Sequence, residues 1–490
     1  MTIKETSARQ AFAAACAHLA SYRPADPRQP PAVTFNPSGP LRAEHSGRTR
    51  PESSTDGVRG KACGPLHDAL RVLSSGTCSA RELVEHSLAQ VRKWDGELGA
   101  FAELTAHLAL ADADRRDRQR ADGAPCGPLH GIPLTVKDVI DVAGVPTRAG
   151  SAAYHHLPTA DADAVARLRA AGAIILGKTT THEFALGVTT PQSRNPHDVT
   201  RIPGGSSGGS AIAVATGMGL GSIGTDTRAS IRVPAALSGV VALKPTYGAV
   251  PATGIVPLSW TMDHVAPMAA SVADVALLLD VLTGCWGTAA YPGLVREVRV
   301  GVCETGFAGA DPAVDRSARA AVARLADLGC QVQPADRPTA RDLDDANSAG
   351  LIISRVEAAA FHRAAATSLD DCWDETADQL HEAGRVPAID YIDAQRLRAD
   401  LTRSLLAQFD AHDVLAMPTT TVTAPPVVEA ARYLLTLSRN TIPWSLVGFP
   451  ALTLPCGRSP DGLPVGLQLI APPHHEATLV TVGAALEQAF

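Results

Sequence analysis

Short apolar runs of strand length alternate with helical stretches along most of this chain. The strand-like runs are Ile132–Val136, Ala173–Leu176, Val240–Leu243, Val298–Val302 and Val414–Met417. The helical stretches between them are Ala160–Ala171, Val272–Leu282, Pro312–Leu328 and Ala388–Phe409. This alternation predicts an α/β fold in which helices cover both faces of a sheet. With 490 residues, 45% of them hydrophobic, the chain can bury the large core that such a sheet needs.

The first 60 residues differ from the rest because prolines recur among Arg, Ser, Gly and Asp. These prolines are Pro24, Pro27, Pro30, Pro31, Pro37, Pro40 and Pro51. Such a segment buries too little apolar surface to offset the entropy of ordering it. We therefore divide the chain into an irregular Pro-rich N-terminal segment, 1–60, and one globular domain, 61–490. In that domain Ser79 and Glu82 have the spacing of a capping box and begin a predicted helix that runs to about Trp94.

Charge and cysteine content argue against several classes of partner. The net charge is −7, so the chain lacks the basic surplus of a nucleic-acid-binding protein. The longest apolar runs are shorter than the roughly 18 residues that span a membrane. The nine cysteines are dispersed and none has CxxC spacing, which disfavours a zinc ribbon or redox motif. We expect a cytoplasmic protein with reduced thiols, no metal or cofactor, and neither nucleic acid nor a membrane as a partner.

Two glycine patterns match nucleotide-binding motifs but lack the context that those motifs need. Segment 172–179 matches GxxxxGK[ST], yet its intervening residues Ala-Ile-Ile-Leu resemble a buried strand rather than a phosphate-binding loop. Segment 219–224 matches GxGxxG, but Lys244 stands where an acidic residue would be needed about 20 positions later. We predict that neither segment binds a nucleotide.

Ser206 lies in a glycine-serine segment, 203–210, that leads into an apolar helix-like run. The glycines allow close approach of the backbone, and Ser206 and Ser207 supply hydroxyls. The segment also fits GxSxG, the nucleophile elbow of hydrolases with a Ser-His-Asp triad. That elbow needs a strand before the serine, whereas residues 195–203 resemble a loop. An esterase-like triad is therefore a lesser alternative.

Ser230 lies in a second segment, 221–234, where a strand-like stretch turns sharply into a helix. Backbone N–H groups in such a turn form an anion-binding nest, which suits the oxyanion of a tetrahedral intermediate. Asp226 and Arg232 are expected to pair and brace the turn. The residues expected around the oxyanion and the substrate are Thr227, Arg228, Ala229 and Ser207.

Lys137 ends an apolar strand-like run, where a charged side chain is unusual. Burial would lower its pKa and keep a fraction of the amine neutral, as a proton acceptor requires. A solvated lysine is the common alternative. A hydroxyl is a weak nucleophile at its ordinary pKa and needs an adjacent base. Lys137, Ser206 and Ser230 together can form a Ser-Ser-Lys relay for acyl transfer.

The segments around these three residues resemble the amidase signature family, and the resemblance runs from about residue 64 to the C-terminus. Other matching segments are Gly177–Phe184, Leu243–Thr246, Asp263–Pro267 and Gly462–Leu469. The resemblance implies a single large mixed sheet covered by helices on both faces. It also implies that Ser230 is the nucleophile and that Lys137 is the base. Ser206, at a cis peptide bond, would relay the proton between them.

The function implied by this resemblance is hydrolysis of a small or medium linear carboxamide to a carboxylate and ammonia or an amine, through an acyl-enzyme on Ser230. The expected partner is a small-molecule amide, and a homodimer is a family-level expectation. A helical stretch near 340–410 is expected to lie over the site. One alternative is the A subunit of a glutamine-dependent tRNA amidotransferase, which needs further chains as partners.

The chain departs from the family pattern just before the nucleophile, where Arg228 and Ala229 replace glycines. A positive φ at Ala229 would cost about 1 kcal/mol or more. Two orientations of Arg228 are open, toward an anionic substrate group or into solvent. Ala266 and Ser445 also stand where Gly and Asn are frequent. A further alternative is a binding or scaffold protein whose catalysis these changes impair.

Overall fold

A computed structural model describes residues 8–23, 65–284 and 295–490. Within these ranges eleven strands form one sheet, in the order β1-β3-β2-β4-β6-β5-β10-β11-β9-β7-β8. The strands are β1 (Phe101–Leu104), β2 (Pro133–Lys137), β3 (Ile174–Thr179), β4 (Gly221–Asp226), β5 (Val241–Lys244), β6 (His264–Ala269), β7 (Arg299–Val302), β8 (Gln331–Pro334), β9 (Val414–Pro418), β10 (Ala451–Arg458) and β11 (Pro464–Ile470).

The sheet is mixed, with two groups of parallel strands, antiparallel pairs between the groups, and the edge strand β1 antiparallel to β3. Strand β2 pairs in parallel with β3 and β4, and β7 pairs in parallel with β8 and β9. Between these groups, β4, β6, β5, β10, β11 and β9 pair in antiparallel succession. The single large mixed sheet is therefore confirmed, and all five strand-like runs of the sequence lie in it.

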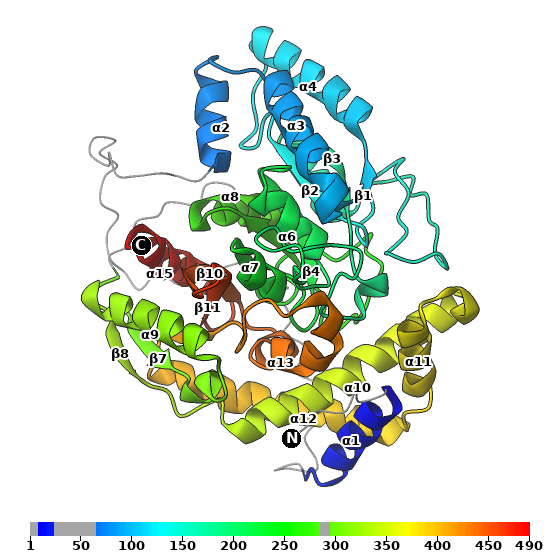
Figure 1. The fold of residues 1–490 in the computed structure, drawn as a ribbon, viewed down its shortest axis with the longest axis vertical. Coiled ribbons are helices and arrows are strands. Elements are labelled where there is room, and N and C mark those ends of the chain that lie inside the picture. The colour runs from blue at the N-terminus through cyan, green and yellow to red at the C-terminus, as the bar shows by residue number, and fades with distance from the viewer. Residues whose placement is uncertain (1–7, 24–64, 285–294) are drawn as a thin grey trace.

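The helices between and around the strands cover both faces of the sheet (Figure 1). They are α1 (Ala8–Ala20), α2 (Pro65–Ser74), α3 (Ala80–Leu98), α4 (Ala106–Ala121), α5 (Asp163–Ala170), α6 (Gly208–Ala215), α7 (Arg232–Ser238), α8 (Val272–Thr283), α9 (Pro312–Asp327), α10 (Ala340–Ala364), α11 (Asp374–Ala383), α12 (Ala388–Leu406), α13 (Leu434–Ser438), α14 (Ile442–Leu446) and α15 (Glu476–Gln488). The predicted capping box is present at Ser79 and Glu82, and its helix continues beyond Trp94 to Leu98.

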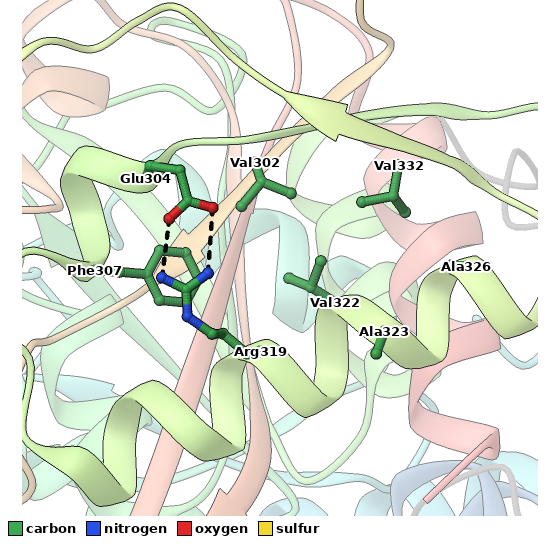
Figure 2. A pocket seen from close by; sticks show the side chains of 8 residues that line it. All are labelled: Val302, Glu304, Phe307, Arg319, Val322, Ala323, Ala326 and Val332. Carbon is green, nitrogen blue, oxygen red and sulfur yellow. Dashed lines mark hydrogen bonds and ion pairs between the residues drawn. The ribbon is translucent and has the colours of Figure 1, made fainter.

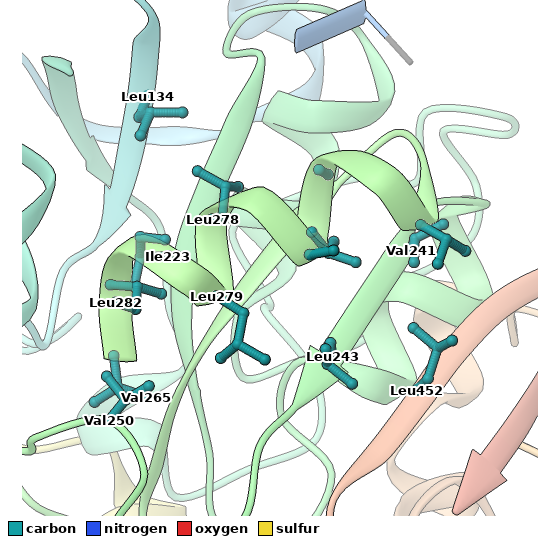
Figure 3. Packing of buried hydrophobic residues seen from close by; sticks show 14 of the residues in the cluster. Leu134, Ile223, Val241, Leu243, Val250, Val265, Leu278, Leu279, Leu282 and Leu452 are labelled. Atoms are coloured by element: carbon teal, nitrogen blue, oxygen red, sulfur yellow. The ribbon is translucent and has the colours of Figure 1, made fainter. Parts of the chain in front are cut away.

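Alternation of side chains along β6 shows how one strand serves two helical layers. Ala266 and Met268 belong to a buried cluster with residues of α6 and α7. Val265 and Ala269 point to the other face, because successive side chains of a strand alternate, and they belong to the main core. Figure 3 shows that core, where leucines of α8 meet residues of β2, β4, β5, β6 and β10.

Helices α10, α11 and α12 form a separate layer along one side of the molecule, and α1 packs on it (Figure 1). Tyr22 donates a hydrogen bond to Asp400 of α12, and His18 contacts Asp345 of α10. Residues 24–64, which hold the Pro-rich stretch, lie outside the described residues. The division at residue 60 stays a prediction. Among the described helices, none has both the length and the apolar character needed to cross a bilayer.

Candidate active site

Lys137 stands at the end of β2 with its side chain fully buried. Its Nζ donates to Ser206 Oγ at 2.8 Å and to Thr225 Oγ1 at 2.9 Å. Burial lowers the pKa of Lys137 to about 7, although Asp263 and Asp226 favour the charged form. The predicted burial and the predicted direction of the pKa shift are both confirmed, and the solvated alternative is wrong.

Ser206 is presented by a tight loop that precedes α6, and the Gly205–Ser206 peptide bond is cis, as the family resemblance implies. Glycine is required before it, because a Cβ on Gly205 would lie 2.0 Å from the carbonyl oxygen of Thr189. On the same loop, Thr190 Oγ1 donates to the Gly204 carbonyl at 3.0 Å. What precedes Ser206 is a loop rather than a strand, so the GxSxG nucleophile elbow is not formed.

The loop of Ser206 and the turn of Ser230 are joined by a backbone hydrogen bond, in which Ser207 N–H donates to the Ser230 carbonyl at 3.0 Å. Ser207 Oγ also donates to the Thr225 carbonyl at 3.3 Å. Ser230 is only 3% exposed. The structure therefore brings the three residues singled out from the sequence, Lys137, Ser206 and Ser230, into one buried cluster.

The turn 227–230 is the segment in which the sequence predicts an anion-binding nest. Within the described residues, its backbone N–H groups donate to no protein acceptor. Thr227 Oγ1 donates to Asp263 Oδ1 at 2.6 Å, and Asp263 also accepts backbone N–H bonds from Leu258 and Ser259. Burial raises the pKa of Asp263 to about 6, against these hydrogen bonds. Asp263 thus fixes the first residue of the turn.

The expected ion pair between Asp226 and Arg232 is present, with Arg232 Nε 2.9 Å from Asp226 Oδ2 and both side chains fully buried. Burial alone would raise the pKa of Asp226, but Arg232 holds it well below its usual range. Ser445 Oγ accepts from Arg232 at 2.5 Å and donates to Asp226 at 3.0 Å. Gln468 Oε1 accepts from Arg232 Nη1 at 2.6 Å. Ser445 therefore closes the network that braces the turn.

Ala229 does not carry the strain expected of a residue in a glycine position. It is absent from the non-glycine residues with positive φ in the described part of the chain. Its methyl group is fully buried in a cluster with Ile202, Val233 and Leu237. The cost of a positive φ therefore does not arise, because the turn holds Ala229 without one and its side chain packs in this cluster.

Arg228 does not extend into bulk solvent. Its Nη2 donates to Asn347 Oδ1 on α10 at 2.7 Å, and its Nε is buried with no hydrogen-bond partner among the described residues. The solvent-facing orientation is therefore excluded. The helical stretch near 340–410 does reach the site, because Asn347 belongs to it.

Sequence reasoning missed Thr225, Asp263 and Asn347 as members of the site. Thr225 immediately precedes Asp226 in a segment that we had singled out, and Asp263 begins one of the family-like segments, so both had a signal in the sequence. Asn347 lies in an ordinary helical stretch and had none.

A surface depression elsewhere on the molecule is lined by Val302, Glu304, Phe307, Arg319, Val322, Ala323, Ala326 and Val332 (Figure 2). It lies beside β7 and β8, at the end of the sheet remote from β2 and β4. Its two charged residues, Glu304 and Arg319, pair with each other at 2.9 Å. It contains no residue of the candidate site.

No group of three or more potential metal ligands occurs among the described residues.

A family model described as Amidase matches residues 82–480. The A subunit of the glutamyl-tRNA(Gln) amidotransferase of Chloroflexus aurantiacus is 38% identical over 468 residues, covering 86% of this chain and 95% of that protein. A solved structure described as an amidase has a TM-score of 0.79 at 34% identity, covering 86% of this chain and 99% of the other. The peptide amidase of Stenotrophomonas maltophilia has a TM-score of 0.75 at 31% identity, covering 86% and 96%.

These relatives correct one expectation from the sequence. Several of the similar curated proteins are A subunits of a tRNA amidotransferase. The expectation that the only partner is a small molecule, and that nucleic acid is excluded, was therefore wrong. The physical reason is that the net charge of one chain says nothing about what the other chains of an assembly bind.

Proposed function

Because this chain belongs to the Amidase family, we propose that it hydrolyses a carboxamide through an acyl-enzyme on Ser230. The observation that carries the proposal is the buried Lys137, whose Nζ lies 2.8 Å from Ser206 Oγ. Ser206 is in turn held beside Ser230 by the hydrogen bond from Ser207 N–H to the Ser230 carbonyl. A base, a relaying hydroxyl and a nucleophile are the parts that activated-serine chemistry needs.

In the first half of the proposed reaction, neutral Lys137 accepts a proton from Ser206, and Ser206 accepts the proton of Ser230. The Ser230 oxygen then attacks the amide carbonyl and forms a tetrahedral intermediate. The N–H groups of residues 227–230 are free to donate to its oxyanion. The pKa of Lys137, lowered by burial to about 7, leaves much of the amine neutral at physiological pH.

In the second half, the intermediate collapses as the C–N bond breaks. The proton held by Lys137 passes back through Ser206 to the departing nitrogen, which leaves as ammonia or an amine. Water then gives a proton to the same relay and attacks the acyl-enzyme ester. Breakage of the ester bond releases a carboxylic acid and returns the proton to Ser230.

The curated relatives support one setting for this chemistry, the A subunit of a glutamine-dependent tRNA amidotransferase. In that setting glutamine is the amide, and partner chains and tRNA belong to the assembly. A stand-alone amidase is the second candidate, and it is favoured by the likeness to solved amidases. The ordinary backbone of Ala229 weakens the case for an impaired binding protein.

The experiment that tests the proposal measures ammonia release from glutamine and from small neutral amides, with Ser230→Ala as the control. We expect turnover in the wild type, its loss in Ser230→Ala, and labelling of Ser230 by a fluorophosphonate. A silent wild type in which Ser230 is not labelled would overturn the proposal. Co-purification of the tagged chain from its native cells separates the two settings, because only a member of a larger assembly brings stoichiometric partners and needs them for full glutamine hydrolysis.

A further inference from the structure

Arg228 stands two residues before Ser230 and extends from the turn to the helical layer. Its Nη2 donates to Asn347 Oδ1 of α10 at 2.7 Å, and its Nε is buried without a partner among the described residues. The side chain as a whole is only partly exposed. A guanidinium has five N–H donors, so most of its hydrogen-bonding capacity is unused here.

The charge of Arg228 is not neutralised by the protein. Among the described residues, no carboxylate forms an ion pair with it, and the charged group that acts on it most is Arg355, another cation. Burial lowers the pKa of Arg228 to about 9, so the guanidinium is still protonated near neutral pH. A partly buried charge without a counter-ion is unfavourable, and a bound anion would remove that cost.

Arg355 adds to the positive potential of this region. It is 6% exposed, and it donates to the Leu186 carbonyl, Gln379 Oε1 and Ser354 Oγ, all neutral acceptors. Glu375 is the carboxylate that favours the charged form of Arg355. It forms no direct hydrogen bond with Arg355, because Gln379 lies between them, accepting from Arg355 and donating to Glu375 at 3.2 Å. Arg228 and Arg355 are therefore both fixed in place by neutral groups.

Gly350 of α10 also lies near Arg228. A Cβ on Gly350 would lie 3.3 Å from Ile442 Cγ2 and 4.0 Å from Arg228 Nε, so it would be in ordinary van der Waals contact with the guanidinium. Asn347 orients the guanidinium through a neutral amide oxygen, which fixes its direction and leaves its charge intact. An aspartate at position 347 would instead satisfy the cation internally.

We propose that Arg228 binds an anionic group of the substrate, so that the preferred substrate is a carboxamide that also carries a carboxylate. Arginine is suited to this role because its planar fork matches the two oxygens of a carboxylate. The inference rests on the proposed function of Ser230, because it assigns Arg228 to the substrate that Ser230 attacks. Asn347 acts as the positioning residue for Arg228.

The test compares kcat/KM for succinamate and glutaramate with kcat/KM for the neutral diamides succinamide and glutaramide. We expect the wild type to prefer the anionic member of each pair by at least about tenfold, the lower range for hydrogen bonds to charged groups. Arg228→Gln should reduce that preference to near one, mainly through KM. Asn347→Asp should do the same with Arg228 still present, because it supplies an internal counter-ion, whereas Asn347→Ser, which only weakens the positioning of Arg228, should lower the preference in part.

Binding of succinate to the Ser230→Ala protein, measured by calorimetry, provides a readout that does not need turnover. Arg228→Gln in that background should weaken succinate binding by about 10- to 100-fold. Equal kcat/KM for the charged and neutral amides, or succinate binding unchanged by Arg228→Gln and by Asn347→Asp, would overturn the inference. If neutral amides are hydrolysed and Ser230→Ala abolishes that activity, the proposed function survives such a result. If succinate binds through Arg228 but no amide is cleaved, the proposed function alone fails.

Discussion

Lys137 Nζ lies 2.9 Å from Thr225 Oγ1, and this hydrogen bond connects the candidate base to the strand that leads to the candidate nucleophile. Thr225 belongs to β4, which pairs in parallel with β2 directly before Lys137. Among the described residues, Lys137 forms no ion pair, and its two contacts at the amine are hydroxyl groups. The amine is therefore oriented by neutral groups that hold its direction and do not force it to be charged.

The lowered pKa of Lys137 predicts how activity depends on pH. In the proposed reaction the neutral amine is the active form, and its fraction increases as pH rises through the pKa of about 7. We expect kcat/KM to rise about tenfold per pH unit below that value and to level off above it. A pH–rate profile, with circular dichroism at each pH to show that the protein stays folded, checks this. A flat profile between pH values of about 5 and 8 would contradict it.

Thr225→Val removes one acceptor from Lys137 and nearly conserves the volume of the side chain. We expect kcat/KM to fall by about tenfold or more, the magnitude of a hydrogen bond to a charged group. The acid limb of the pH profile should also move to lower pH, because Thr225 Oγ1 accepts from the amine and so favours its protonated form. A merely structural role would not move this limb.

Thr135→Val is the matched control for that variant. Thr135 lies on β2, two residues before Lys137, and its buried hydroxyl has no hydrogen-bond partner among the described residues. Replacing it with a methyl group should leave both kcat/KM and the pH profile unchanged. Equal effects of the two substitutions would show that the Thr225 hydrogen bond is not functional.

Arg232→Met should destabilise the protein strongly, because it leaves Asp226 as a buried charge without its partner. The expected loss is about 3–5 kcal/mol in the free energy of unfolding, the usual cost of breaking a buried ion pair. Urea denaturation measures it. Arg81→Met is the control, since Arg81 forms its ion pairs on the surface with a side chain that is 44% exposed, and it should cost only a small part of that amount. Comparable losses would contradict the prediction.

Gly205→Ala should abolish activity and lower the melting temperature. The added Cβ would lie 2.0 Å from the Thr189 carbonyl oxygen, so the loop that presents Ser206 must move. Gly96→Ala is a control of the same chemistry on the exposed side of α3, where an added Cβ meets nothing within 4 Å. That variant should be more stable by about 0.5–1 kcal/mol, because alanine favours a helix. Retained activity in Gly205→Ala would show that the loop tolerates the shift.

The core of the site could be predicted from the sequence because each of its parts lies in a continuous segment with a chemical pattern of its own. A lysine after an apolar strand, serines among glycines, and an Asp–Arg pair around a turn are all local features. The fold class followed from alternation of strands and helices, which is also local.

The surroundings of the site could not be predicted, because they come from segments far away in the chain. Asn347 meets Arg228 across 119 residues, and Ser445 meets Asp226 across 219 residues. Neither residue belongs to a pattern that predicts such a contact. The packing of Ala229 could not be predicted either, because the hydrophobic cluster that receives its methyl group is formed by tertiary contacts.

Asn347 is a residue of α10 and not of the sheet. This has a consequence for how the substrate specificity of such a chain can diverge. Lys137 lies on β2, Ser206 precedes α6 and Ser230 follows β4, whereas the partner of Arg228 comes from α10 of the outer helical layer. With the proposed roles of Arg228 and Ser230, substitutions along α10 would change which molecule is bound and leave the residues that cleave the bond unchanged. A lineage, or a protein engineer, can explore new specificities there at little risk to the reaction itself.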